Sequence, residues 1–456
     1  MATTSSFSAS PPGTPSHRSK RPALVIVCLL GAFLAPALPM IFTGYVPEGR
    51  IAKDHYAYHR QVINQFVDQW PSLDWSDYLS ATTPGYHTML TPLGVWLGPD
   101  SVWLQAAAAV FTAALLALWG GWLGRRLAWP YALCASLPLL TSLYFFPSGV
   151  WLLPDNAGWL GGLAVLLLCW SAKYRGVGFY ASVGALMLYL VWVRQSHIWI
   201  AAVVWVAAYV DAASSRSDLI ESRSSRSRLV AVSGALMATL PAAALLVYFV
   251  SLWGGLTPPS FGRQGEVVVT GPNPATPALF LAVWGFVSFF FAGYWLPSAW
   301  RVLRNSAKAK MVLAVIVFVG IVLAVVPPTQ ACVECGRFGG FWGLSRIISV
   351  AGRSPILIVM AIGGAACMGL MLISLPARQA WIGGTAACAF VAAQTANAFA
   401  FQRYLEPLVL ILVPLIATSV NLQELKLQAS GQSRFAWVGP AVLSTTLAAF
   451  TIRRLI

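Results

Sequence analysis

Long apolar segments follow one another along almost the whole chain, and they constrain the fold more than any other feature. The first is Ala23–Thr43, and the others lie near residues 101–123, 128–146, 152–171, 177–193, 196–213, 229–253, 277–297, 311–327, 354–374, 381–400, 405–421 and 436–452. A helix of about 20 residues crosses the roughly 30 Å of hydrocarbon in a bilayer. The sequence therefore predicts an all-α polytopic membrane protein with about 12–13 transmembrane helices.

The charge of the chain fits a membrane protein better than a nucleic-acid-binding protein. Only 9% of the 456 residues are charged, and the mean hydropathy is +0.71, whereas soluble domains carry about 25% charged residues. The net charge of +15 would suit nucleic acid. The basic residues, however, stand in short loops between the apolar segments, as membrane orientation requires. We therefore expect membrane lipids, and no nucleic acid, among the partners.

Alternate threading of the segments divides the loops between two sides of a membrane. Residues 1–22 are rich in Ser, Thr and Pro and predict a disordered, basic cytoplasmic tail before one transmembrane domain over residues 23–456. The cytoplasmic loops then hold most basic residues, which are Arg125, Arg126, Lys173, Arg175, Arg216, Arg223, Arg226, Arg228, Arg301, Arg304, Lys308, Lys310 and Arg378. The predicted outer loops cover residues 44–100, 254–276 and 328–353. Arg453 and Arg454 break this pattern, so the last segment is either a full span or re-entrant.

The first outer loop begins with a polar cluster that precedes an amphipathic helix. Asp54, His55 and His59 come soon after the first span. The apolar residues that follow have helical spacing and are Ile63, Phe66, Val67 and Trp70. Such a helix is expected to lie flat in the membrane interface and to hold Asp54 and His55 near the lipid headgroups. Asp54 is therefore a candidate functional carboxylate, although most loop aspartates are simply solvated.

The same cluster offers ligands for a metal ion, an alternative that the spacing leaves open. His55 and His59 stand one helical turn apart, and Asp54 and His87 would add a carboxylate and a third imidazole. Carboxylate–imidazole sets suit several divalent metals. The spacing fixes no complete ligand set, so we expect no metal and no other cofactor.

Further polar residues stand at the outer ends of later apolar segments. Asp155 opens the fourth segment, and an intramembrane carboxylate is a functional candidate by default. Arg194, Gln195 and His197 lie between the fifth and sixth segments. A guanidinium beside an amide and an imidazole suits a phosphate, although Arg194 would also be explained by snorkelling to the interface.

The remaining candidates stand in the C-terminal half. Arg403 follows the eleventh segment and either binds a phosphate or pairs with Glu406, three residues further on. Three arginines of the third outer loop break the positive-inside pattern and also invite a phosphate: Arg337, Arg346 and Arg353. In the same loop, Cys332 and Cys335 form a lone C-x-x-C, for which a local disulfide is favoured over a zinc site.

Two classes of function fit this distribution. In transfer from a lipid phosphate, arginines stabilise the leaving phosphate while a carboxylate takes the proton of the attacking hydroxyl. The alternative is a transporter or flippase of a lipid-linked or anionic substrate. Such a protein keeps its polar residues near the bilayer midplane, at broken helices. Here they gather at the outer ends of segments and in outer loops, which favours chemistry at the membrane surface.

The order and spacing of these motifs resemble those of GT-C fold glycosyltransferases that use lipid-linked sugars. They are most similar to the family of the ER α-1,2-glucosyltransferase that adds the terminal glucose to the dolichol-linked oligosaccharide. Its Asp-Glu-x-Phe-His-x-x-Gln box corresponds to Asp54, Tyr58, His59 and Gln61. Its Trp and Ile-Thr-Thr-Pro-Pro-Gly-Leu-Tyr segment corresponds to Trp75, Thr82, Thr83, Pro84, Gly85 and Tyr86.

Three later motifs extend the resemblance over most of the chain. Asp155 matches a Tyr-Thr-Asp step, and Arg403, Tyr404 and Pro407 match an Arg-Tyr-x-x-Pro motif. The family's Arg-Gln-Thr-Asn-Ile-x-Trp box corresponds to Arg194, Gln195, Ser196, His197, Ile198 and Trp199. The chain departs from the family in having His55 for Glu, a longer Asp-to-His interval, one Pro fewer and His197 for Asn.

The resemblance implies a GT-C fold and an inverting transfer of a hexose, with glucose favoured, from a polyprenyl- or dolichyl-phosphate donor. The acceptor would be a hydroxyl of a lipid-linked or other glycan at the outer or lumenal face. Asp54 would be the general base. Donor or acceptor would be bound by residues among His55, His59, Gln61, Thr83, Tyr86, Asp155, Arg194, Gln195, His197, Arg337, Arg346, Arg403 and Tyr404. The Ala- and Arg-rich style of the chain favours a bacterial plasma membrane over the ER membrane.

Overall fold

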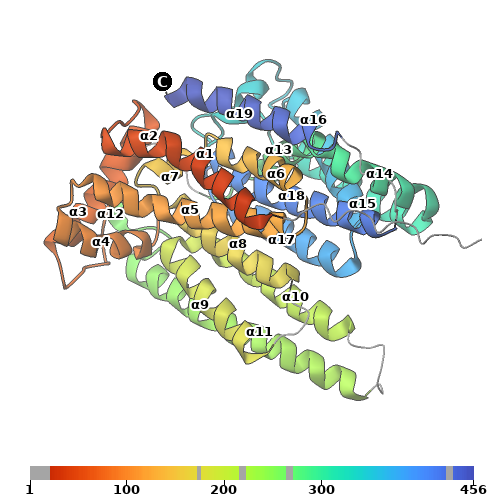
Figure 1. Cartoon of the computed structure of the whole chain (residues 1–456), viewed down its shortest axis with the longest axis horizontal. Helices are drawn as coiled ribbons and strands as arrows, with labels where there is room; N and C mark the ends of the chain where they lie inside the picture. Colours follow the sequence, from red (N-terminus) through yellow and green to blue (C-terminus); the bar gives the residue numbers. More distant parts are fainter. Residues whose placement is uncertain (1–20, 172–175, 215–221, 263–270, 428–434, 456) are drawn as a thin grey trace, which may run out of the picture.

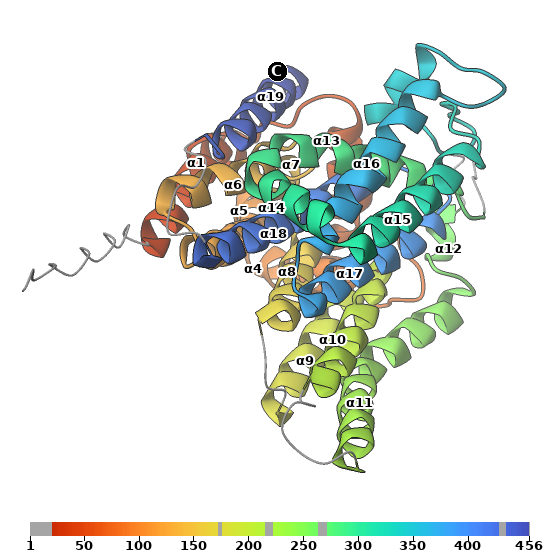
Figure 2. The ribbon, with the colours of Figure 1, turned by 90° about the vertical axis from the view of Figure 1, so that its right-hand side faces the viewer.

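The chain folds into a bundle of packed helices (Figures 1 and 2). The structure is a computed structural model that describes residues 21–171, 176–214, 222–262, 271–427 and 435–455. Within these ranges it has no β-strand, only two isolated bridges, Cys332 with Arg337 and Val350 with Arg353. The expected all-α class is confirmed. The predicted tail of residues 1–22 falls almost entirely outside the described residues.

The helices of the N-terminal half include two short irregular helices, η1 and η2. They are α1 (Pro22–Phe42), α2 (Arg50–Lys53), η1 (Asp54–Arg60), α3 (Gln61–Asp68), α4 (Gly85–Leu97), α5 (Val102–Gly124), α6 (Trp129–Thr141), α7 (Pro147–Val150), α8 (Asp155–Ser171), α9 (Val177–Val193), η2 (Gln195–Trp199), α10 (Ile200–Ser214) and α11 (Ser222–Trp253). The C-terminal half contains α12 (Pro259–Gly262), α13 (Thr276–Phe290), α14 (Ala292–Asn305), α15 (Ala307–Val325), η4 (Gly340–Arg346), α16 (Pro355–Ile373), α17 (Ala377–Thr395), α18 (Gln402–Leu427) and α19 (Val438–Leu455).

Each predicted apolar segment is helical, although residues 277–297 are divided between α13 and α14. Fewer helices than expected satisfy the requirements for a membrane span. Among the described residues, seven are long and apolar enough, or up to eight if α13 and α14 are taken as one bent span. The prediction of 12–13 spans exceeds this number for two physical reasons. Helices α6, α8 and α9 have only 13, 17 and 17 residues, which is short for crossing about 30 Å of hydrocarbon. Helices α17 and α19 reach the length but carry more polar side chains.

Polar contacts at the two ends of α8 mark two opposite ends of the bundle. At its N-terminal end, Asp155 pairs with Arg194, just beyond the end of α9. At its other end, the carbonyls of Cys169 and Trp170 accept hydrogen bonds from Arg378, which also pairs with Asp211 near the end of α10. Seventeen helical residues rise by about 25 Å. The alternating course predicted for these segments therefore agrees with the contacts at both ends.

Close helix contacts in the bundle depend on small residues. Helices α13 and α16 cross where Gly285 meets Gly364. A Cβ at Gly364 would lie 1.8 Å from the carbonyl oxygen of Leu281, so no larger residue fits without moving a helix. Small residues that let backbones approach are typical of helix pairs in membranes.

The amphipathic helix of the first outer loop forms, but its apolar face packs on protein. Ile63 belongs to a buried apolar cluster with Tyr86 and Leu90 of α4. Phe66 packs on Tyr78, in a second cluster that includes Phe249. The part of this face that was expected to contact lipid therefore contacts protein. Residues of the 70–84 segment and of α4 cover Ile63 and Phe66. Trp70, at the end of the predicted stripe, stays exposed.

The structure bears on two further predictions, the disulfide of the third outer loop and the position of the C-terminal arginines. Cys332 and Cys335 form a disulfide, as predicted. Helix α19 runs beside α6, and its Thr451 hydroxyl donates to the carbonyl of Thr141 at the end of α6. The Tyr45 hydroxyl after α1 donates to the carbonyl of Leu455. Arg453 and Arg454 therefore lie at the end of the bundle where α1 and α6 end.

Candidate functional site

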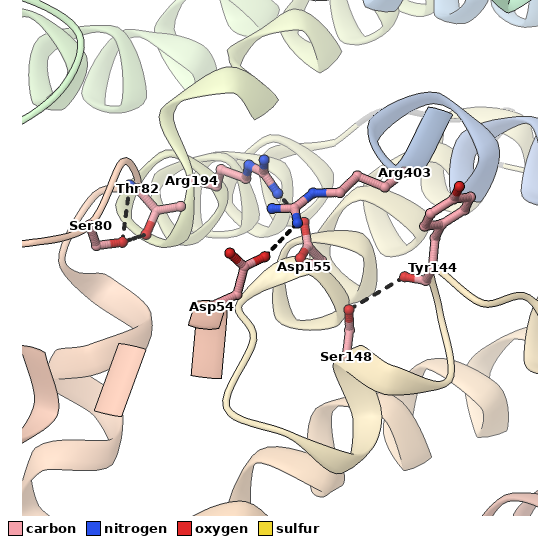
Figure 3. A network of polar contacts seen from close by, with 8 residues as sticks. All are labelled: Asp54, Ser80, Thr82, Tyr144, Ser148, Asp155, Arg194 and Arg403. Carbon is pink, nitrogen blue, oxygen red and sulfur yellow. Dashed lines mark hydrogen bonds and ion pairs between the residues drawn. The ribbon is translucent and has the colours of Figure 1, made fainter. Parts of the chain in front are cut away.

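Two ion pairs lie side by side at one end of the bundle (Figure 3). Arg403 Nη1 lies 2.5 Å from Asp54 Oδ2, and Arg194 Nη1 pairs with Asp155 Oδ1. The four side chains point toward one another from η1, α8, the end of α9 and the start of α18. Asp54 and Arg403 are 349 positions apart in the sequence. The fold thus brings four of the predicted site residues into one cluster, which we call the paired cluster.

The local structure explains how each of the four side chains is placed. Asp54 opens η1, a π-helix, and wide helical turns of this kind are frequent at functional sites. Asp155 is the first residue of α8, where the positive end of the helix dipole stabilises a carboxylate. Arg194 has extended backbone angles that end α9. Arg403 is the second residue of α18. All four therefore stand where a helix begins or ends.

Tyr404 holds the two guanidinium groups close together. Its ring centroid lies 4.9 Å from the guanidinium carbon of Arg194 and 5.1 Å from that of Arg403. Guanidinium groups at this distance are attracted by the face of an aromatic ring. Tyr404 therefore acts on the paired cluster by positioning both arginines, whereas the sequence predicted it only as one of several binding residues.

The paired cluster is largely, but not fully, withdrawn from solvent. The exposed fractions of the side chains are 9% for Asp54, 16% for Asp155, 17% for Arg194 and 28% for Arg403. Two carboxylates and two guanidiniums leave the cluster without net charge, which limits the cost of burying it. Among the described residues, the buried Nε of the Arg403 guanidinium has no hydrogen-bond partner.

Three buried histidines support the cluster in their neutral form. His55 Nδ1 accepts the backbone N–H of Leu152 at 3.1 Å, which fixes the loop just before Asp155. His59 Nδ1 and His87 Nε2 lie 3.0 Å apart, and their rings stack. Burial, with a smaller effect of Arg60, lowers the pKa of His55 to about 4. Burial also lowers the pKa of His59 to about 3 and that of His87 well below its usual value.

Other predicted ligands are engaged in holding the chain together. The Gln195 amide accepts from the N–H of Thr83 at 3.1 Å and donates to the carbonyls of Ala81 and Leu256. The Thr83 hydroxyl donates to the carbonyl of Val191 at 2.7 Å. These contacts join the Pro-Gly turn of the first loop to the segment between α9 and α10. We therefore assign Gln195 and Thr83 to positioning this segment, which carries Arg194.

Tyr86 and His197 are buried beside the paired cluster. Within the described part of the chain, the Tyr86 hydroxyl and His197 Nδ1 have no hydrogen-bond partner. A Cβ at Gly158 would lie 2.5 Å from His197 Nε2, so the glycine leaves space for the imidazole against the first turns of α8. Burial raises the pKa of Tyr86, with a smaller contribution from Asp155. Tyr86 therefore keeps its proton and remains a hydrogen-bond donor.

Several predicted residues do not join the cluster. Gln61 is exposed, and so is Arg346 on η4. Arg337 donates from Nε to the carbonyl of Gln330 at 3.0 Å, within its own loop. Arg353 donates to the carbonyls of Val325 and Val326 and so caps the C-terminal end of α15. In the described structure, the third loop supplies no arginine to the paired cluster.

Two contacts differ from what the sequence indicated. Glu406 does not pair with Arg403; its carboxylate accepts from Ser142 at 2.6 Å and from Gln402 at 2.5 Å. The contact with Ser142 joins α18 to the end of α6, and no local pattern could have predicted it. The sequence indicated His87 only as a candidate metal ligand, but its imidazole stacks on that of His59. Among the described residues, no three His, Cys, Asp or Glu side chains gather as a metal site would require.

Comparisons of the chain with protein-family models, with curated proteins and with solved structures found no match. The class of this protein is therefore inferred from its fold and its candidate site alone. The chain is an all-α protein with the apolar helices of a multi-pass membrane protein. Four of its ionisable residues converge in the paired cluster at one end of the bundle.

Proposed function

We propose that the protein is a membrane glycosyltransferase that moves a hexose from a polyprenyl-phosphate donor to an acceptor hydroxyl at the membrane surface. The observation that carries this proposal is the convergence of two carboxylates and two guanidiniums at one end of an apolar bundle. The chemistry needs a base for the acceptor, cations for the phosphate and an apolar body beside the lipid chain. The paired cluster and the surrounding helices offer all three. The resemblance of the sequence motifs to GT-C enzymes supports the same reaction.

In this proposal the ion pairs exchange partners when substrates bind. The donor phosphate takes the guanidiniums of Arg403 and Arg194, which Tyr404 already holds together. Asp54, released from Arg403, then accepts the proton of the acceptor hydroxyl. The hydroxyl oxygen forms a bond to the anomeric carbon while the bond from that carbon to the phosphate oxygen breaks. Polyprenyl phosphate leaves with the bonding electrons, and the two arginines stabilise its added charge.

Hydroxyl groups on both sides of the paired cluster suit a sugar. Figure 3 shows Ser80 and Thr82 on one side of the ion pairs and Tyr144 and Ser148 on the other. Ser80 Oγ lies 3.1 Å from Thr82 Oγ1, and both side chains are buried. In the proposal these hydroxyls exchange their mutual contact for hydrogen bonds to the hydroxyls of the bound sugar.

The test is transfer or slow hydrolysis by the purified protein in nanodiscs. Polyprenyl-phosphate-glucose and polyprenyl-phosphate-mannose are supplied separately, and release of polyprenyl phosphate is measured. The substitution Asp54→Asn removes the base and conserves its shape, so turnover is expected to fall at least 100-fold, within the usual range for a general base of about 10²–10⁴-fold. Donor binding should change little by comparison.

A matched control is Asp100→Asn, which removes another loop carboxylate that pairs with an arginine. Asp100 lies 2.7 Å from Arg60, and its side chain is 80% exposed. This variant should retain full turnover. Equal turnover in Asp54→Asn and wild type would overturn the role of Asp54. Tight donor binding without turnover, with a glycan acceptor present, would instead favour a transporter.

A further inference from the structure

Helix α14 leaves the bundle in a direction that suits the surface of a membrane. It follows α13 after a single residue, and the two axes differ by 99°. Helix α13 has only 15 residues, but it packs against α16, which is long and apolar enough to cross a membrane. A helix perpendicular to α13 therefore runs along the plane of the bilayer when α13 lies across it. Its next neighbour, α15, is again long and apolar enough to cross a membrane. Helix α14 is therefore placed between two membrane-associated helices at the level where one ends and the other begins.

The end of the bundle at which α14 lies is opposite to the paired cluster. Asn273, just before α13, donates to the carbonyls of Cys335 and Ala398, close to the start of α18. The 15 residues of α13 then rise by about 22 Å before α14 begins. Figure 1 accordingly draws α2 and α3 on the left and α14 at the right-hand edge.

The two faces of α14 have different partners. Tyr294, Trp295 and Ala299 are buried against the bundle. The Tyr294 hydroxyl contacts the carbonyl of Tyr131 near the start of α6. On the other face, Leu296 is 45% and Trp300 is 52% exposed. An interfacial helix has this composition, with an aromatic and an aliphatic residue directed to the acyl boundary.

The basic residues of this region complete the pattern. Residues 292–310 contain four basic residues and no acidic one: Arg301, Arg304, Lys308 and Lys310. The guanidinium carbon of Arg304 lies 4.9 Å from the ring of Trp300. Arg304, Lys308 and Lys310 are exposed. A cationic patch beside an exposed tryptophan is complementary to phosphate groups at the level of lipid headgroups.

We propose that α14 and the first turn of α15 form a binding surface for the headgroups of anionic phospholipids. The occupied leaflet is the one at the end of the molecule away from Asp54. Leu296 and Trp300 enter the acyl boundary, while Arg304 and Lys308 bind headgroup phosphates. This surface is independent of the proposed sugar transfer, because it shares no residue with the paired cluster.

The test compares lipid binding by two variants of equal charge. Arg304→Gln/Lys308→Gln removes two cations from the proposed surface. Arg453→Gln/Arg454→Gln removes two exposed cations at the other end of the bundle, where Arg454 also lies over an aromatic ring, that of Phe450, at 5.6 Å. Binding of phosphatidylglycerol to the full chain in phosphatidylcholine–detergent micelles is titrated by the rise in unfolding midpoint. The midpoint in phosphatidylcholine alone shows that each variant is folded.

Each lost cation near a lipid surface weakens binding by about fivefold. We therefore expect the α14 variant to bind phosphatidylglycerol roughly 25-fold more weakly, and the control variant to bind like wild type. Arg304→Lys/Lys308→Arg should retain the affinity, and soluble glycerol phosphate should not replace the lipid. Equal weakening in both glutamine variants, or no weakening in the α14 variant, would overturn the proposal. Stabilisation by glycerol phosphate alone would overturn the assignment to a lipid.

Discussion

At the scale of single residues, the pairing of Asp54 with Arg403 leads to a prediction about stability. Arg403→Gln leaves the Asp54 carboxylate buried without its cation, a change that costs 3–5 kcal/mol in a fully buried pair. Because 28% of the Arg403 side chain is exposed, we expect a smaller loss, about 1–3 kcal/mol of unfolding free energy. Denaturant or thermal unfolding in detergent measures this loss.

The control for this prediction is a double-mutant cycle. Asp54→Asn in the Arg403→Gln background removes the stranded charge and should restore part of the lost stability. Strictly additive losses would show that the two side chains do not interact energetically. The variant Arg346→Gln, which removes an exposed arginine of η4, should leave the unfolding midpoint unchanged.

His59 predicts a dependence of stability on pH. Its pKa is about 3 in the folded protein, because of burial and the nearby guanidiniums, against 6.5 when exposed. The groups that face it are Asp155, Arg403, His55, Arg194 and His87. Below pH 6.5 the unfolded chain binds a proton that the folded chain does not, so stability falls as the pH falls.

Between pH 7.5 and pH 5 this effect amounts to about 2 kcal/mol for one histidine. The unfolding free energy of wild type should therefore decrease over this range. In His59→Gln the decrease should be smaller by about that amount. An unchanged pH dependence in the variant would show that the pKa of His59 is the same in the folded and the unfolded protein.

Sequence reasoning located the residues of the paired cluster but not their partners. Asp155, Arg194 and Arg403 stood out because they lie at the ends of apolar segments, where an ionisable residue is costly. Asp54 stood out because it belongs to a polar cluster between the first span and an amphipathic helix. Which carboxylate meets which guanidinium depends on contacts between different segments, 39 positions apart for Asp155 and Arg194 and 349 positions apart for Asp54 and Arg403. The local rule for Arg403 and Glu406 failed for the same reason, since Ser142 of a distant segment binds Glu406.

At the scale of elements, the crossing of α13 and α16 offers a test with two adjacent glycines. A Cβ at Gly364 would meet the Leu281 carbonyl oxygen at 1.8 Å, whereas a Cβ at Gly363 would have no atom within 4 Å. Gly364→Ala should therefore lower the unfolding free energy by about 1–3 kcal/mol, the usual cost of overpacking. Gly363→Ala should be neutral or slightly stabilising. Similar unfolding midpoints for the two variants would contradict the close crossing.

The helices also show which structural properties the apolar periodicity of the sequence does not predict. The apolar face of α3 was predicted correctly as a helical stripe, because its spacing is a local property. The surroundings of this face were not predicted correctly, because the sequence pattern is the same whether the face contacts lipid or the clusters of Tyr86 and Phe249. The same ambiguity affects the span count. An apolar segment predicts a helix, but its length in the fold depends on turns such as the 99° bend between α13 and α14.

At the scale of the whole molecule, the two ends of the bundle should be accessible from opposite sides of a membrane. The paired-cluster end carries Asp100 and Ile347, and the opposite end carries Arg125 and Asn305; all four are exposed. A single cysteine is introduced at each position in a Cys388→Ala background, since Cys388 is the exposed free thiol among the described cysteines. Intact cells are then treated with a membrane-impermeant maleimide.

Cysteines at Asp100 and Ile347 should react in intact cells, and those at Arg125 and Asn305 only after permeabilisation. The physical reason is the positive-inside rule, because the basic loops around Arg125 and Arg304 belong on the cytoplasmic side. If only one cysteine of each pair reacted in intact cells, the two ends of the bundle would not lie on opposite sides of the membrane. If only the cysteines introduced at Arg125 and Asn305 reacted in intact cells, the two ends would still lie on opposite sides, but the orientation would be reversed. The paired cluster would then face the cytoplasm. This reversed orientation would contradict an acceptor site on the outer face of the membrane. The proposed lipid-binding surface of α14 could still be tested as described.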